Sequence, residues 1–92
     1  MAMVAHIVKR AGHSEPYVEA KLHESIELAA LSVRALEGEA ELLAERVSSA
    51  VTDWVHDKIE VTSLDVRMVA SRLIGELHTD AAYAYDTHDY SI

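Results

Sequence analysis

One stretch near the N-terminus, residues 7–21, constrains the fold more than any other part of the chain. Its first residues alternate as in a β-strand, a turn is expected at Gly12, and a second extended piece then leads into a long helical pattern. A two-stranded hairpin is only marginally stable on its own. The rest of the chain must therefore provide a surface on which this hairpin packs.

The length of 92 residues predicts a single domain, residues 1–92. A chain of this size buries roughly 60–65% of its unfolded surface, which is enough for one core. Phe is absent and the aromatic residues are one Trp and four Tyr, so the core is expected to be aliphatic. Three Gly and one Pro favour helices over an all-strand sandwich.

Two long amphipathic helices are predicted after the hairpin. Apolar residues recur at spacings of three and four from Glu19 to Leu36, and Gly38 is suited to a C-terminal cap. A second helix is expected from residue 39 to 58, with an inward stripe that includes Ala50 and Trp54. These two helices supply the surface that the hairpin needs.

A third strand and two further helices are predicted in the second half. Residues 59–61 alternate and can add a strand to the hairpin, and Pro16 places the return strand at an edge of that sheet or marks its end. Thr62 and Asp65 have capping-box spacing before a third helix that runs to Leu77. A short last helix is expected over residues 81–88.

The predicted order is strand, strand, helix, helix, strand, helix, helix, so the expected fold class is α+β and mainly helical. Each helix must bury one apolar stripe, and the core is too small for helices on both faces of a sheet. We therefore expect a four-helix bundle that a small three-stranded sheet caps at one end.

Charge is unevenly distributed along the sequence. The chain has 16 acidic and 8 basic residues, yet residues 1–14 contain no acid and include Lys9 and Arg10. Lys21 lies in the first turn of a predicted helix, where free N–H groups and the helix dipole favour an anion. Three cations that converge there would suit a polyphosphate. Solvated surface charge is the alternative for the same residues, and it stays open.

Several other kinds of site and protein are disfavoured. The lack of cysteine excludes disulfides, thiol chemistry and zinc sites built from Cys, and a cytoplasmic protein is expected. No apolar run approaches the ~20 residues that span a bilayer, and the net charge of −8 argues against nucleic acid or anionic membrane partners. No nucleophile–base pair or phosphate-binding glycine loop is present, so no catalytic site is predicted. His78, Asp80, Asp86, His88 and Asp89 could gather into a metal site of imidazole and carboxylate groups, but a polar helix cap and a fraying tail are favoured for them.

The sequence Lys-Arg-x-Gly-x-x-Glu-Pro-Tyr-x-x-x-Lys-Leu at residues 9–22 resembles the opening motif of the ATP-cone domain. This domain is the nucleotide-sensing module of many ribonucleotide reductases and of the repressor that controls their genes. Residues 59–69 resemble its third strand and following helix, and residues 81–85 resemble its last helix. The resemblance covers most of the chain and implies a four-helix bundle capped by a three-stranded sheet.

The resemblance also implies ATP or dATP as ligand, with Mg²⁺ carried in by the nucleotide. The residues it implies at this ligand come from the hairpin, the first helix and the third helix: Ile7, Lys9, Arg10, Glu15, Tyr17, Lys21, Ser63 and Arg67. Lys9, Arg10 and Lys21 would meet the phosphates. Ile7, Glu15 and Tyr17 would lie near the adenine. Arg67 stands where the family more often has Gln or His, a change that favours phosphate binding.

The function that follows from the resemblance is regulatory. The chain would bind ATP or dATP and signal through a change in oligomerisation, or through contact with a ribonucleotide-reductase-type partner. One alternative is an acidic helical adaptor that binds a protein partner and no nucleotide. Another is the regulatory half of a transcription repressor, although the chain has neither a zinc ribbon nor the positive charge for direct DNA contact.

Overall fold

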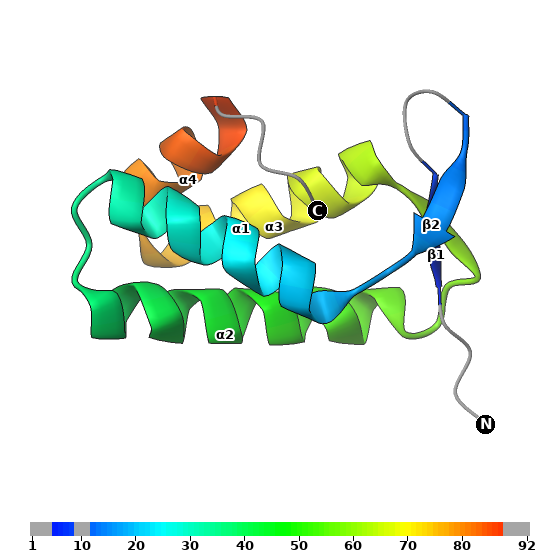
Figure 1. Ribbon diagram of the computed structural model, residues 1–92, viewed down its shortest axis with the longest axis horizontal. Helices are drawn as coiled ribbons and strands as arrows, with labels where there is room; N and C mark the ends of the chain where they lie inside the picture. Colours follow the sequence, from blue (N-terminus) through cyan, green and yellow to red (C-terminus); the bar gives the residue numbers. More distant parts are fainter. Residues whose placement is uncertain (1–4, 9–11, 88–92) are drawn as a thin grey trace.

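The computed structural model describes residues 5–8 and 12–87, which form a four-helix bundle with a three-stranded sheet at one end (Figure 1). The predicted α+β class and the predicted order of elements are both confirmed. The elements are β1 (His6–Val8), β2 (Ser14–Pro16), α1 (Glu19–Ser32), α2 (Glu37–Val55), β3 (Glu60–Thr62), α3 (Ser63–Leu77) and α4 (Thr79–Thr87).

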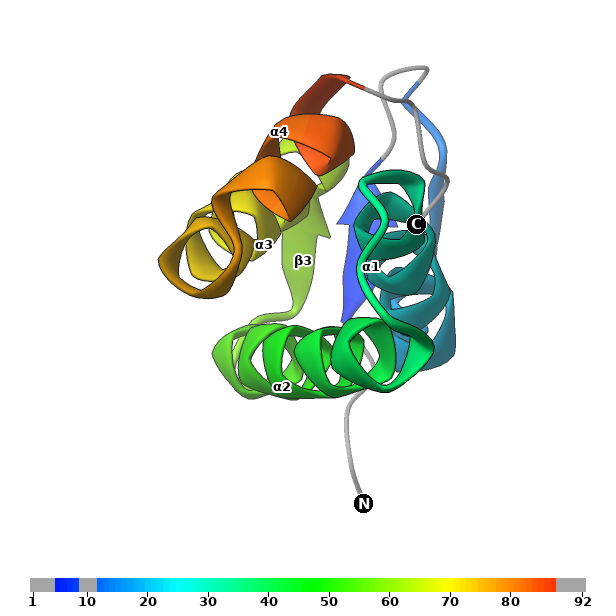
Figure 2. The same ribbon diagram turned by 90° about the vertical axis from the view of Figure 1, so that its left-hand side faces the viewer.

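The four helices close a ring around one core. α1 and α3 each pack against both α2 and α4, and Figure 2 shows this arrangement nearly end on. The core is aliphatic apart from one tyrosine, as the composition predicts. Its largest fully buried apolar side chains come from every helix and from β1: Ile7, Leu22, Ile26, Val47, Val51, Val66, Ile74 and Tyr85. None of the described helices is long and apolar enough to span a bilayer.

β1 is the central strand of the sheet. It pairs antiparallel with β2, where Ile7 lies opposite Glu15, and parallel with β3, where Ile7 lies opposite Val61. β2 is therefore an edge strand and ends at Pro16, which confirms the position predicted from the missing proline N–H. The side chains of Ala5 and Ile7 face the core and that of His6 is exposed. One face of β1 therefore covers the sheet end of the core.

The turn between α1 and α2 differs from the prediction. Arg34 has a left-handed backbone conformation, with φ of 65°. Its N–H donates to the Leu31 carbonyl at 3.1 Å, and the Ala35 N–H donates to the Ala30 carbonyl at 3.1 Å. These two bonds form a Schellman motif that ends α1 with an arginine in the usual glycine position. The prediction that Gly38 caps this helix is wrong, because Gly38 lies in the first turn of α2.

Three apolar residues of the predicted helices, Leu36, Leu77 and Ala50, are exposed. Leu36 precedes α2 and is 76% exposed, because α1 ends before it. Leu77 is the last residue of α3 and is half exposed, and Ala50 lies on the outer side of α2. The helical period predicted most of the buried positions of the long helices, but it failed at Leu36 and Leu77 near the helix ends and at Ala50 within α2.

Candidate functional site

β1 and β2 and the starts of α1 and α3, which carry the predicted ligand residues that the structure describes, lie toward the sheet end of the bundle (Figure 1). In the parallel pairing of β1 with β3, Val8 lies opposite Thr62, the residue that precedes α3. The chain therefore leaves β1 beside the N-terminus of α3. Lys9 and Arg10 follow Val8 directly in the sequence, but they lie outside the described residues.

Ile7 and Glu15 face each other across the β1–β2 pair. The Ile7 side chain is 1% exposed and belongs to the core, so a ligand reaches it only if the hairpin moves. Glu15 is partly exposed on the edge strand. Of this pair, only Glu15 therefore presents its side chain to a ligand in the present conformation.

Tyr17 is held against α2 by a chain of hydrogen bonds. Its backbone N–H donates to the Ala5 carbonyl at 2.8 Å, and its hydroxyl lies 2.8 Å from Thr52 Oγ1. Thr52 Oγ1 donates its own proton to the Ser48 carbonyl at 2.8 Å, so the Tyr17 hydroxyl is the donor to Thr52. Burial is the main cause that raises the pKa of Tyr17, and the charge of Glu19 adds to the rise. These hydrogen bonds fix the position of the Tyr17 ring between the hairpin and α2.

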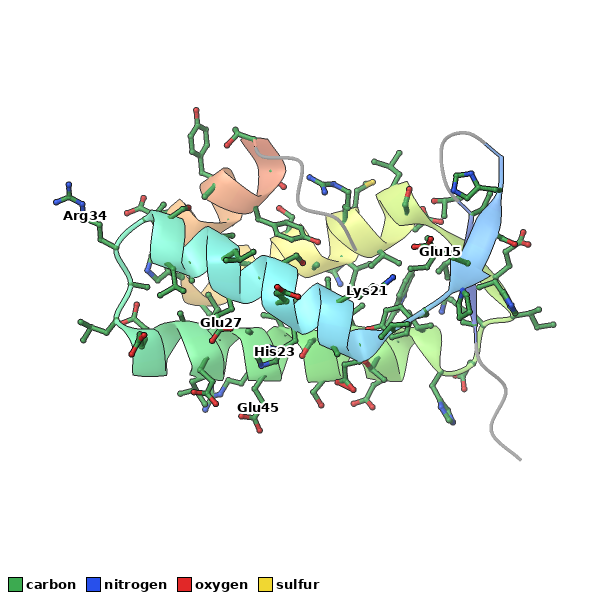
Figure 3. The ribbon with its side chains drawn as sticks, viewed as in Figure 1. Glu15, Lys21, His23, Glu27, Arg34 and Glu45 are labelled. Carbon is green, nitrogen blue, oxygen red and sulfur yellow. The ribbon has the colours of Figure 1, made fainter. Side chains whose placement is uncertain are left out.

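Lys21 projects from the first turn of α1 and is exposed. Figure 3 shows its side chain extending toward the hairpin, on the side where Glu15 lies. The N-cap of α1 is Val18, whose side chain accepts no hydrogen bond. The start of α1 thus offers a cation near the hairpin, and its backbone N–H groups are not capped by the residue before the helix.

Ser63 and Arg67 lie one turn apart on the same side of α3, and both are partly exposed. Arg67 Nη2 donates to the Tyr85 carbonyl at 3.1 Å, and the guanidinium carbon lies 5.2 Å from the centre of the Tyr85 ring. This contact links the first half of α3 to α4. A guanidinium has five N–H donors, so the link to Tyr85 does not use up the hydrogen-bonding capacity of Arg67.

The N-terminus of α3 has its own cap. The Asp65 N–H donates to Thr62 Oγ1 at 3.0 Å, and the Thr62 N–H donates to Asp65 Oδ2 at 3.4 Å, which confirms the predicted capping box. The Asp65 carboxylate also places a negative charge at this helix start. Any anion bound here would therefore be held by the Ser63 and Arg67 side chains more than by the backbone of α3.

Tyr85, a neighbour of the site, was not predicted as part of it. Its side chain is fully buried, and burial raises its pKa to about 12, against the opposing effects of the Arg67 charge and the Ser25 hydroxyl. Thr52 is the other residue that the sequence did not reveal. No local pattern pairs Tyr17 with a threonine 35 positions later, or Arg67 with a carbonyl 18 positions later.

His78 acts as a cap in this structure. Its Nδ1 accepts a hydrogen bond from the Ala81 N–H at 3.1 Å, and its Nε2 lies 3.3 Å from Glu39 Oε1. The imidazole thus ties the start of α4 to α2. Within residues 5–8 and 12–87, no group of three or more His, Asp or Glu side chains is arranged to hold a metal ion.

Comparison with known proteins identifies the domain. The sequence matches the family model of the ATP cone domain over residues 5–90, which includes the hairpin and all four helices. A search of curated proteins gave no match. The ATP cone is a nucleotide-sensing regulatory module that binds adenine nucleotides, and it is not a catalytic domain. Since the match covers nearly the whole chain, this protein belongs to the ATP cone domain family.

Proposed function

We propose that this chain binds ATP or dATP at the sheet end of the bundle. The observation that carries the proposal is the parallel β1–β3 pairing, because Val8 lies opposite Thr62. β1 therefore ends beside the start of α3, which carries Ser63 and, one helical turn later, Arg67. Lys21 extends toward the same hairpin from α1 (Figure 3).

The proposed roles follow the chemistry of each side chain. Lys9, Arg10 and Lys21 neutralise the phosphates, and Ser63 and Arg67 add hydrogen bonds from α3. Each charge-assisted contact is expected to contribute about 1.5–3 kcal/mol. The adenine lies along the hairpin, where Glu15 accepts from its amino group and the fixed Tyr17 ring packs near the base. Ile7 contacts the base only after a shift of β1, because its side chain is covered.

Mg²⁺ would enter with the nucleotide. This ion prefers phosphate oxygens together with one or two carboxylates. Glu15 is the only acidic residue among residues 1–18, so it is the hairpin's one candidate for such a contact. The residues present fit a nucleotide-borne ion better than a dedicated metal cage, because the described part of the chain gathers no cluster of acidic or histidine ligands.

Isothermal titration calorimetry with ATP and dATP tests the binding proposal. We expect Lys9→Ala and Lys21→Ala each to weaken binding by roughly 10- to 100-fold, which corresponds to the contact energies above. Arg72→Ala is the matched control, because it removes one exposed positive charge from α3 on a different face from Arg67. If the unaltered chain gives no heat with either nucleotide, the proposal is wrong and the adaptor alternative is favoured.

We further propose that occupancy is signalled by a change in self-association or in contact with a ribonucleotide-reductase-type protein. The hairpin, α1 and α3 would all contact the nucleotide, so its binding can change how these elements sit against the rest of the bundle. Analytical ultracentrifugation without nucleotide, with ATP and with dATP checks this. Identical masses in the three conditions would exclude signalling by self-association.

A further inference from the structure

His78 connects α3 to α4 and takes part in the ends of both helices. Its backbone N–H donates to the Ile74 carbonyl at 2.7 Å, and its carbonyl accepts from the Ala82 N–H at 3.1 Å. Its backbone is extended, as is usual for the residue that precedes a helix. Because Nδ1 accepts from the Ala81 N–H at 3.1 Å, the imidazole takes the place that Ser, Thr, Asp or Asn usually occupies at a helix start.

This cap requires a neutral imidazole. A ring nitrogen accepts a hydrogen bond only through a free lone pair, and a neutral imidazole has one such nitrogen. Nδ1 of His78 is therefore unprotonated, and the proton is on Nε2, which lies 3.3 Å from Glu39 Oε1. A protonated imidazole has an N–H on both nitrogens, so it accepts no hydrogen bond in either ring orientation. Proton uptake by His78 therefore removes the acceptor of the Ala81 N–H.

Charged groups near His78 come from three helices. Glu39 and Arg46 of α2 line the same small pocket as the His78 ring, Glu76 is in the last turn of α3, and Asp80 is in the first turn of α4. Of the described residues of α1, none lines this pocket. Protonation strengthens the attraction between the ring and Glu39 but ends the cap, so the two effects oppose each other in the total free energy of unfolding. A local measurement at the start of α4 is therefore the one that reports on the cap.

α4 is short enough to depend on such a cap. It has nine residues, and isolated helices shorter than ~12–15 residues are marginal in water. Ala81 and Ala82 near its start are buried, and α4 packs against α1 and α3, so opening of its first turn exposes part of the core. The His78 side chain is 24% exposed, so protons from solvent can reach it.

We propose that His78 is a pH-sensitive N-cap of α4. The neutral ring holds the first turn of α4 through the Ala81 N–H, and the protonated ring releases this turn while it stays beside Glu39. The change takes place between about pH 8 and pH 5, where imidazoles change their charge. Acidification thus loosens the start of α4, whether or not the chain binds a nucleotide.

NMR of the full chain without nucleotide, from pH 8 to pH 5, tests this proposal. The ¹⁵N shifts of the imidazole report which nitrogen of His78 carries the proton. Hydrogen exchange of the Ala81 amide, corrected for the pH dependence of the intrinsic exchange rate, reports on the cap. We expect the proton on Nε2 at pH 8, and a rise of roughly fivefold in the corrected exchange at Ala81 as the ring is protonated, which matches the typical contribution of an N-cap.

Three variants separate the cap from other effects of pH. His78→Asn keeps an acceptor that does not titrate, so its corrected exchange at Ala81 should stay constant between pH 8 and pH 5. Glu39→Gln removes the neighbouring carboxylate but keeps the cap, so its response to pH should remain. His56→Asn is the matched control, because it removes an exposed histidine at the other end of α2, and its response should also remain.

Three results would each overturn the proposal. The first is a neutral His78 ring with its proton on Nδ1. The second is a constant corrected exchange at Ala81 while the ring of the unaltered chain titrates. The third is a response in His78→Asn as large as that of the unaltered chain.

Discussion

Replacing Arg34 with glycine should stabilise the protein. A non-glycine residue in the left-handed region costs roughly 1–2 kcal/mol, and Arg34 has φ of 65° there. Glycine removes this cost but gives the unfolded chain more backbone freedom, which takes back about 0.4–1 kcal/mol. The Arg34 side chain is exposed and extends away from the bundle in Figure 3, so little else changes. With the middle of each of these two ranges, the net gain in the free energy of unfolding is about 0.5–1 kcal/mol.

Urea and thermal unfolding followed by circular dichroism measure this gain. For a domain of this size, a gain of about 0.5–1 kcal/mol corresponds to a rise in Tm of roughly 2–8 °C. Arg34→Ala is the control, because it removes the same charge and side chain but keeps the Cβ that is strained at positive φ. If Arg34→Gly is no more stable than Arg34→Ala, Arg34 is not left-handed and the Schellman motif is misplaced.

Three further changes test other parts of the fold. Gly38→Ala should stabilise the protein by about 0.5 kcal/mol in urea unfolding, because Gly38 lies in the first turn of α2 and, apart from its chain neighbours and the backbone of its own helix, no atom lies within 4 Å of the added Cβ. A loss of stability would show that Gly38 ends a helix instead. Thr62→Ala should lower the free energy of unfolding by about 1 kcal/mol because it removes the α3 cap, and Thr62→Ser should keep most of the cap's contribution. An equal loss of stability in both variants would mean that the hydroxyl does not cap the helix. The free energy of unfolding should fall by about 2–3 kcal/mol as the pH rises from 10 to about 12, because the folded state keeps the Tyr85 phenol neutral above its ordinary pKa of 10.0. Tyr85→Phe should make this alkaline loss of stability smaller. If the variant loses as much stability between pH 10 and 12 as the unaltered chain, burial does not raise the pKa of Tyr85 as assigned.

The sequence predicted the framework of this fold because its strongest signals are local. Pro16 lacks an N–H, which confined its strand to an edge, and Thr62 with Asp65 has the spacing of a capping box. The end of α1 could not be predicted in the same way. An arginine at positive φ leaves no compositional mark, and Gly38 offered a more conventional cap four residues later.

The sequence could suggest which residue types belong to the candidate site, but not their contacts. The motif over residues 9–22 predicted a helix that begins shortly before Lys21, and Lys21 lies in the first turn of α1. The partners of Tyr17 and Arg67 depend instead on how the helices pack. A hydrogen bond to Thr52 on α2 and another to the Tyr85 carbonyl on α4 arise only from the tertiary arrangement.

Mapping amide chemical shifts by NMR during titration with ATP tests most directly whether the nucleotide binds at the sheet end of the bundle. We predict that the largest shifts fall in β1 and β2, in the first turn of α1, and in α3 from Ser63 to Arg67, with much smaller shifts at the α1–α2 turn around Arg34. The opposite distribution, or no shifts at saturating ATP, would contradict a nucleotide site between the hairpin and the helix ends.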